Sequence, residues 1–193
     1  MGCWCVDCAQ PTPEFTTKAE LVAAINSGKS GWSDMATWDV SGITDFSGVF
    51  NFFDANRQDD GWDGTVGEIP IQDWDVSNGE NFYQMFAGAA DFNGDVSTWD
   101  VSQGTNFGQM FYGAEAFNGD VSKWAVSSGT EFGKMFYETK AFKGDVSKWD
   151  VSHFEGTDFE GTYFEIIFKD SGFCPAMFCK QCGPDGCCIP SRL

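Results

Sequence analysis

The sequence has few of the residues, and none of the motifs, on which most enzymes depend. It contains a single histidine, His153. No nucleophile elbow, phosphate loop or zinc-hydrolase motif occurs in it. Acidic residues are numerous enough for a glycosidase pair, but without geometry no two of them stand out. We therefore expect a protein that is not an enzyme, with no catalytic residue and no resident cofactor.

Basic residues are also scarce. The 193 residues include 11 Lys and Arg against 29 Asp and Glu, for a net charge of −18. No Lys or Arg occurs between Gln58 and Ser122, a stretch that holds twelve Asp and Glu. Such a surface repels phosphate, so nucleic acid is not expected as a partner. It attracts basic surfaces and cations, which favours protein partners or a place in a larger complex.

No stretch of the sequence approaches the ~20 apolar residues of a membrane-spanning helix, so no membrane span is expected. The start, Met1-Gly2-Cys3, lacks the basic beginning and apolar centre of a signal peptide. Met-Gly-Cys is compatible with N-terminal lipidation, but Val6 stands where the myristoylation motif requires Ser or Thr. We therefore do not expect a lipid anchor at this end.

Cysteine is missing from residues 9–173. All eight cysteines lie near the two ends: Cys3, Cys5, Cys8, Cys174, Cys179, Cys182, Cys187 and Cys188. This segregation favours end segments held by disulfides, and thus an extracellular, cell-surface or other oxidising compartment. Three cysteines in front and five behind are both odd numbers, so complete pairing requires a bridge between the ends or between chains. The alternatives are free thiols or a zinc site, since Cys5–Cys8 and Cys179–Cys182 have CxxC spacing.

What the sequence does have is a repeat of 25 residues. Trp74, Trp99, Trp124 and Trp149 mark its copies, and Trp38 starts an earlier copy with eleven extra residues. A fixed period of this size indicates stacked structural units. We predict a β-solenoid, a leucine-rich-repeat-like right-handed coil of about five turns. Each turn would hold a short strand, as at 96–101, and a turn of helix, as at 109–116.

The periodic Trp, Phe and Met positions are predicted to form buried ladders, because stacking covers what one repeat cannot cover alone. Before the repeats, Thr17 and Glu20 form a capping box followed by apolar residues on one face, which predicts a helix over 17–27. We divide the chain into an N-terminal cysteine-containing segment and capping helix (1–31), a repeat region (32–168) with an insertion loop (51–67), and a Cys-rich C-terminal cap (169–193).

The insertion holds the densest cluster of oxygen ligands. Its weak calcium candidates are Asp54, Asn56, Asp59, Asp60 and Asp63. The EF-hand pattern fails, because Gly67 stands where the bidentate glutamate belongs. A structured or partner-binding loop is the preferred interpretation, with Trp62 as its anchor residue.

Aspartates also recur with the period. Asp95, Asp120 and Asp145 would lie above one another, as would Asp75 and Asp100. Carboxylates at this spacing repel, and calcium would relieve the repulsion. The preferred interpretation is that these side chains cap turns or extend into water. The serine row at 77, 102, 127 and 152 offers a less favoured surface for glycan or ice.

The unit WDVS…F…MF…FNGDVS resembles the BspA-like surface-protein repeat, the DUF285 class, a relative of leucine-rich repeats. The resemblance covers about residues 32–164. It departs from the usual unit in Gly79, Gly104 and Gly129, and in Phe107 and Phe132, where Val and Met are favoured. The resemblance implies a right-handed solenoid used in adhesion or protein interaction, and it lends no catalytic residue.

Two functions of different classes follow from these observations. The first is a non-enzymatic interaction or adhesion module outside the cell. The second is a structural or linker subunit of a larger multiprotein assembly, which would co-purify stoichiometrically with its partners. A calcium- or glycan-binding surface protein is a lower alternative.

Overall fold

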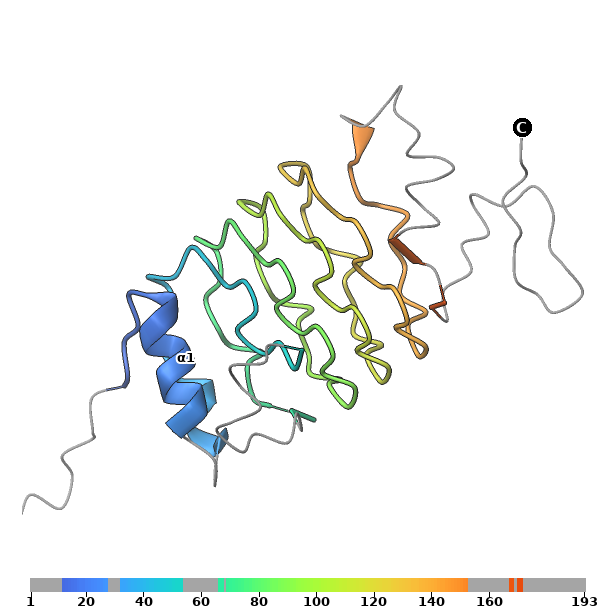
Figure 1. The fold of residues 1–193 in the computed structure, drawn as a ribbon. Coiled ribbons are helices and arrows are strands. Elements are labelled where there is room, and N and C mark those ends of the chain that lie inside the picture. Colours follow the sequence, from blue (N-terminus) through green and yellow to red (C-terminus); the bar gives the residue numbers. More distant parts are fainter. Residues whose placement is uncertain are drawn as a thin grey trace, which may run out of the picture.

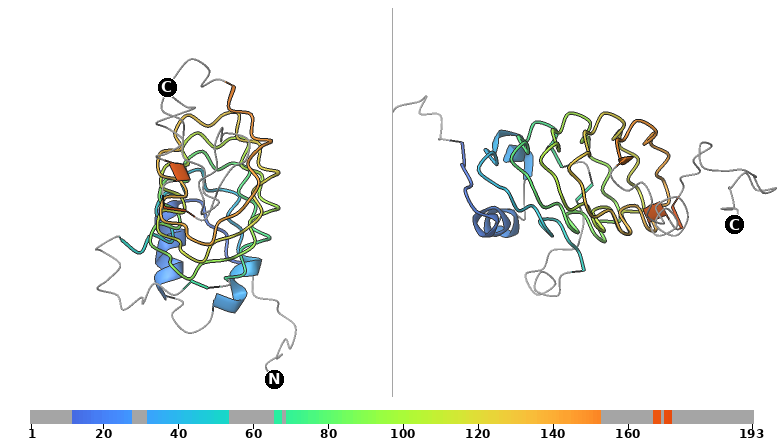
Figure 2. Two further views of the ribbon diagram at one scale, coloured as in Figure 1. Left: turned by 90° about the vertical axis from the view of Figure 1, so that its right-hand side faces the viewer. Right: turned by 90° about the horizontal axis from the view of Figure 1, so that it is seen from above.

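The computed structural model describes residues 12–27, 32–53, 66–67, 69–152, 167–168 and 170–171. In these residues helix α1 spans Lys18–Ser27 and the 3-10 helix η1 spans Trp32–Thr37. The remainder consists largely of turns. Successive repeats lie over one another in a stack, and α1 lies against one end of it (Figure 1). Two further views show that the repeats follow similar outlines around a shared interior (Figure 2).

Helix α1 begins at the predicted capping box. The Thr17 hydroxyl accepts a hydrogen bond from the Glu20 N–H at 3.3 Å, and the Glu20 carboxylate accepts the Thr17 N–H at 3.0 Å. Each group thereby satisfies a backbone donor that a helix start leaves unpaired. Leu21 and Ile25, four residues apart, are buried on one face of the helix. The helix predicted over 17–27 is confirmed.

The predicted β-solenoid is wrong. The described residues contain no β-strand and no sheet, and few of them are helical. In the described part of the chain, β-type pairing between repeats is limited to isolated parallel bridges, such as those that join Asn81 to Asn106 and Asn106 to Glu131. The segment 96–101 is not a strand, and 109–116 consists mainly of turns in place of the predicted helix.

The reason lies in how the backbone hydrogen bonds alternate. The N–H groups of Phe82, Gln84 and Phe86 donate to the next repeat, at 2.8 to 3.0 Å. Between them, the N–H of Met85 turns back to the Phe82 carbonyl. A strand requires consecutive extended residues, but in this segment each repeat has a residue of positive φ: Gly48, Gln84, Gln109 and Lys134, at 55° to 63°. Each repeat therefore bonds to its neighbour through a chain of turns.

The predicted aromatic core is confirmed. The Trp, Phe and Met positions of the repeats are buried, and their rings stack from one repeat to the next. Phe86 and Phe111, for example, are parallel within 1° with centroids 5.5 Å apart. Buried indoles also keep their hydrogen bonds, since Trp99 donates to the Ile71 carbonyl at 3.0 Å and Trp124 to the Val96 carbonyl at 3.0 Å.

The departures from the usual repeat unit belong together in space. A Cβ added to Gly104 would lie 2.3 Å from the ring of Phe107, and one added to Gly129 would lie 2.4 Å from the ring of Phe132. Real Cβ atoms do not approach other atoms this closely. The glycine therefore makes room for the phenylalanine three residues later, and the two substitutions form one packing unit.

Candidate interaction surface

The eleven extra residues do not disturb the register of the described repeats on either side of them. Phe46 and Phe82 are 36 residues apart, yet their rings stack at 5.5 Å, as do those of Phe82 and Phe107, which are 25 residues apart. The Phe46 N–H donates to the Asn81 carbonyl at 2.8 Å, so the backbone register is also kept. The face from which the insertion departs is therefore built on a regular core.

Both sides of the insertion are anchored by side chains that accept backbone hydrogen bonds. On the exit side, the buried Asn51 accepts the Phe53 N–H at 2.8 Å. On the return side, the two carboxylate oxygens of Asp91 accept the N–H groups of Val66 and Gly67, each at 3.1 Å. Such charge-assisted bonds are about twice as strong as neutral ones. The stack thus fixes where the insertion begins and ends.

A chain of side-chain amides runs across the repeats beside this exit. Asn51 donates to Gln84 at 3.1 Å, Gln84 donates to Gln109 at 2.9 Å, and Gln109 donates to the Tyr83 hydroxyl at 3.1 Å. Because each amide both donates and accepts, the bonds connect three repeats. Gln84 and Gln109 have positive φ values of 56° and 55°. We call these residues the amide chain.

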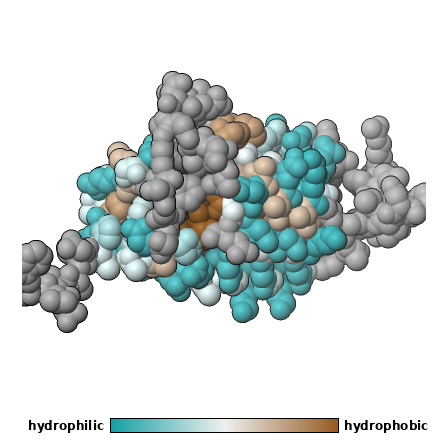
Figure 3. All heavy atoms as spheres, turned by 90° about the horizontal axis from the view of Figure 1, so that it is seen from below, coloured by the Kyte–Doolittle hydropathy of each residue, from teal (hydrophilic) through white to brown (hydrophobic). Residues whose placement is uncertain are grey.

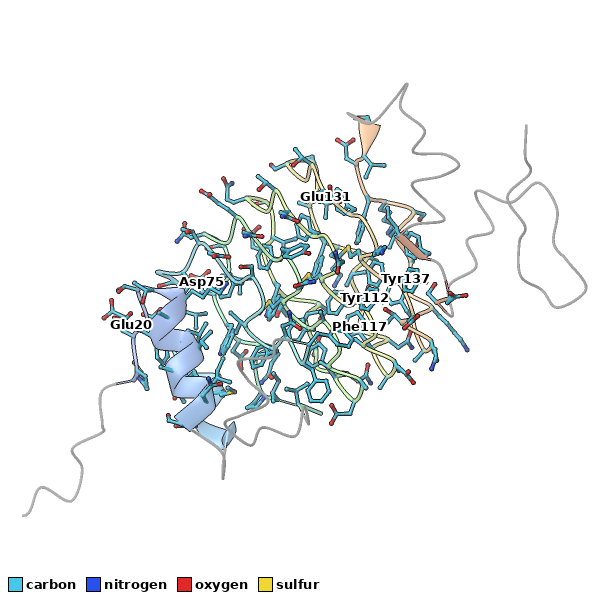
Figure 4. The ribbon with its side chains drawn as sticks, in the orientation of Figure 1. Glu20, Asp75, Tyr112, Phe117, Glu131 and Tyr137 are labelled. Atoms are coloured by element: carbon cyan, nitrogen blue, oxygen red, sulfur yellow. The ribbon has the colours of Figure 1, made fainter. Side chains whose placement is uncertain are left out.

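Next to the amide chain lies a row of aromatic rings on the surface. Phe53 is 55 % exposed, and it meets Tyr112 edge-on with ring centroids 5.7 Å apart. Tyr112 stacks on Tyr137 at 5.2 Å, and both tyrosines are half-buried. Gly88 lies under the Phe53 ring, where an added Cβ would come within 2.8 Å of it. We call Phe53, Tyr112 and Tyr137 the aromatic row; Figure 4 shows its two tyrosines side by side.

Charged groups border the C-terminal end of the aromatic row. The Lys134 ammonium lies 5.7 Å from the centre of the Tyr137 ring. Lys140 pairs with Glu115 at 2.7 Å, and both side chains are at least half exposed. Partial burial, with the nearby Glu138 charge, raises the pKa of Tyr112. Aromatic faces, carboxylates and ammonium groups therefore meet at one place.

Several of the sequence-based predictions concern residues outside the described part of the chain. They are the calcium candidates Asp54, Asn56, Asp59, Asp60 and Asp63, the anchor Trp62, and all eight cysteines. Their roles stay predictions. Within the described ranges, no group of three or more His, Cys, Asp or Glu is arranged to hold a metal.

The periodic aspartates cap turns, as preferred from the sequence. Asp95, Asp120 and Asp145 each accept the N–H of the serine two residues later, at 2.8 to 2.9 Å. Asp100 accepts the Ser102 N–H in the same way at 3.0 Å. Hydrogen bonds from the Ser102 side chain and backbone lower the pKa of Asp100. In the serine row, Ser77, Ser102 and Ser152 are thus joined to the aspartate two residues earlier, whereas Ser127 follows Ala125.

Sequence reasoning missed the aromatic row and the amide chain. Tyr112 and Tyr137 do recur at the repeat interval, directly after the Met-Phe pair. That position is Ala87 in the preceding repeat, so a change from a small to an aromatic residue was the available signal. Phe53 gave no such signal, because its neighbours in the stack come from other repeats.

The face seen from below carries apolar residues in its middle and hydrophilic residues on either side (Figure 3). In the part of the chain that the structure describes, no helix combines the length and apolar character needed to cross a membrane.

Comparison with protein families gives one match. The family described as "Mycoplasma protein of unknown function, DUF285" matches residues 63–165, just over half of the chain. Neither the curated proteins nor the solved structures gave a match.

Proposed function

The chain belongs to this DUF285 family, whose function is unknown, and from that premise we propose that it is a non-enzymatic protein-interaction or adhesion module. Its partner would bind the face formed by the aromatic row and the insertion. The resemblance of its repeat to surface-protein repeats supports this function, and the repeat stack supplies a rigid support for the face.

The observation that carries the proposal is the aromatic row. Nearly every other large apolar side chain of the described residues is buried, whereas Phe53 is 55 % exposed beside two half-buried tyrosines. Aromatic side chains on a rigid surface are enriched among the residues that dominate binding energy. Asn51 accepts a hydrogen bond from Phe53 before the insertion, and Asp91 accepts one from Val66 after it. In this proposal a partner contacts the aromatic surface and the insertion together.

The cysteines at both ends support a place outside the reducing cytoplasm. Intact mass after thiol alkylation, with and without prior reduction, tests this proposal. Cysteines that become reactive only after reduction would support an oxidising compartment. Cysteines that react after chelation instead would point to bound metal and to an intracellular role.

The interaction itself is tested with the whole chain immobilised and exposed to surface proteins of its source. Any retained protein is purified, and its affinity is measured for the wild type, Phe53→Ser, a deletion of residues 54–64, and Thr130→Ala as a control on an exposed turn. We expect Phe53→Ser and the deletion to weaken binding at least tenfold and the control to leave it unchanged. The deletion restores the 25-residue spacing, so it should fold.

Two results would overturn the proposal. One is the absence of any partner that binds at micromolar concentration. The other is a partner whose affinity is the same for all four proteins. A retained protein present in fixed stoichiometry from the start of purification would favour the structural-subunit alternative.

A further inference from the structure

We infer that the aromatic row takes a cationic segment of its partner, an extended stretch of chain that presents Arg or Lys side chains. This inference rests on the proposed function and specifies the partner's chemistry. It starts from an asymmetry between repeats: the last full repeat supplies its own cations to the surface, and the two repeats before it do not.

In the last repeat the cations occupy defined places. The Lys134 ammonium lies 5.7 Å from the centre of the Tyr137 ring, and Lys140 bonds to Glu115 at 2.7 Å. A cation over a tyrosine ring is attracted by the ring's negative face. The surface therefore already shows, within one molecule, which chemistry it accommodates.

In the preceding repeats the equivalent places hold no cation. The position of Lys134 is Gln109 in one repeat and Gln84 in the other, and the position of Lys140 is Glu115 and then Ala90. The stretch from Gln58 to Ser122 contributes twelve Asp and Glu and no Lys or Arg. The stretch that contains Tyr112 thus brings carboxylates but no basic residue of its own.

The carboxylates and the ring surfaces at the aromatic row favour the same kind of partner. Phe53 and Tyr112 offer apolar surface. Glu115 and Glu138 lie close enough to Lys140 to raise its pKa, and, with partial burial, the Glu138 charge also raises the pKa of Tyr112. Both carboxylates act on the same ammonium, that of Lys140, and an acidic or purely apolar partner would add no positive charge to it. A segment with spaced guanidinium or ammonium groups compensates the two carboxylates and places its methylene stems on the rings.

The probe is a fluorescein-labelled ten-residue peptide of alternating arginine and glycine, titrated with the whole chain and followed by anisotropy. Tyr112→Leu with Tyr137→Leu keeps apolar area and removes the aromatic faces, and we expect it to weaken binding about tenfold. Lys134→Ala with Lys140→Ala should strengthen binding about threefold, because the molecule's own cations no longer compete.

Controls matched in charge separate the row from the general acidity of the molecule. Glu115→Gln with Glu138→Gln is compared with Asp75→Asn with Asp100→Asn, which changes the charge equally; Asp75 lies apart from the two tyrosines in Figure 4. Lys134→Ala with Lys140→Ala is compared with Lys123→Ala with Lys148→Ala, near the periodic aspartates. We expect each pair of changes at the aromatic row to alter the affinity for the peptide at least three times as much as its control pair does.

Equal effects of the matched pairs would overturn the inference, since they would show attraction to overall charge alone. Unchanged affinity after the tyrosine replacements would also overturn it. Neither outcome touches the proposed function, which fails only if no natural partner depends on Phe53 and the insertion. Unfolding curves of each variant confirm that the comparison concerns folded protein.

Discussion

At the scale of single residues, the tryptophans show how the stack satisfies its buried polar groups. Each indole from Trp74 onward donates to the backbone carbonyl that lies three residues before the tryptophan of the preceding repeat. Trp38 stands at the N-terminal end of the series. Its buried indole N–H has no hydrogen-bond partner among the described residues. The same residue type thus occurs with and without its hydrogen bond.

This contrast predicts different costs for one replacement. Trp99→Phe removes one of two hydrogen bonds to the Ile71 carbonyl, which still accepts the Trp74 N–H at 3.1 Å, whereas Trp38→Phe removes an N–H without a partner among the described residues. Both changes lose similar apolar volume. We expect Trp99→Phe to lower the free energy of unfolding by about 0.5–1.5 kcal/mol more than Trp38→Phe, the net value of one lost hydrogen bond, as measured by urea denaturation. Equal losses would show that the indole bonds add nothing to stability.

A second prediction concerns Glu138, whose φ is 57° where Gly88 and Gly113 have 74° and 68° at the equivalent positions. A side chain in this left-handed region costs about 1 kcal/mol. We expect Glu138→Gly to be more stable than Glu138→Ala by about that amount. Gly113→Ala is the reciprocal control, since an added Cβ there has 3.7 Å of space and its cost comes from the backbone. Equal melting temperatures for the two Glu138 variants would show that the positive φ at this position does not strain the backbone.

At the scale of elements, each repeat is held together by pairs such as Gly104 and Phe107. Gly104→Ala alone forces a Cβ against the ring and should cost about 1–3 kcal/mol. Phe107→Met alone leaves unfilled space in the core. The double variant should be more stable than the sum of the two losses by about 0.5–3 kcal/mol, because the unbranched Met can yield where the ring cannot. A double-mutant cycle in urea measures this coupling, and simple additivity would refute the pairing.

The elements also show what sequence could predict. The period located the Trp and Phe ladders, because burial of recurring apolar residues follows from stacking alone. The capping box of α1 depends only on residues close together in the sequence, so it was predicted correctly. The strands were wrong: alternating Val and Trp resembles a strand, but the Trp99 N–H turns back to the Val96 carbonyl at 3.2 Å, and Asp95 accepts the Ser97 N–H at 2.9 Å. The aromatic row was missed because Phe53 and Tyr112 meet only across repeats.

At the scale of the whole molecule, acidity acts on stability in two opposite ways. The net charge of −18 favours expansion, and protonation of carboxylates relieves that repulsion. The hydrogen bonds of the aspartates in the turns act in the other direction, because they favour the ionised carboxylates of the folded protein. Hydrogen bonds from the side chain and backbone of the serine two residues later lower the pKa of Asp120 and Asp145, and those from the Ser97 backbone and side chain lower the pKa of Asp95, from an ordinary value of 3.8.

The turns decide the expected response to pH. A carboxyl whose pKa is lower in the folded than in the unfolded protein contributes stability that is complete above the unfolded value and is lost as the pH falls through the folded value. We therefore expect the free energy of unfolding to be steady near neutral pH and to fall below about pH 4. The triple variant Asp95→Asn, Asp120→Asn, Asp145→Asn keeps an oxygen that accepts the serine N–H but no longer titrates. Its unfolding, followed in urea from pH 7 to pH 3, should depend less on pH than that of the wild type. A wild type that becomes more stable on acidification would show that relief of repulsion outweighs the turns, and identical slopes would show that these three aspartates do not carry the effect.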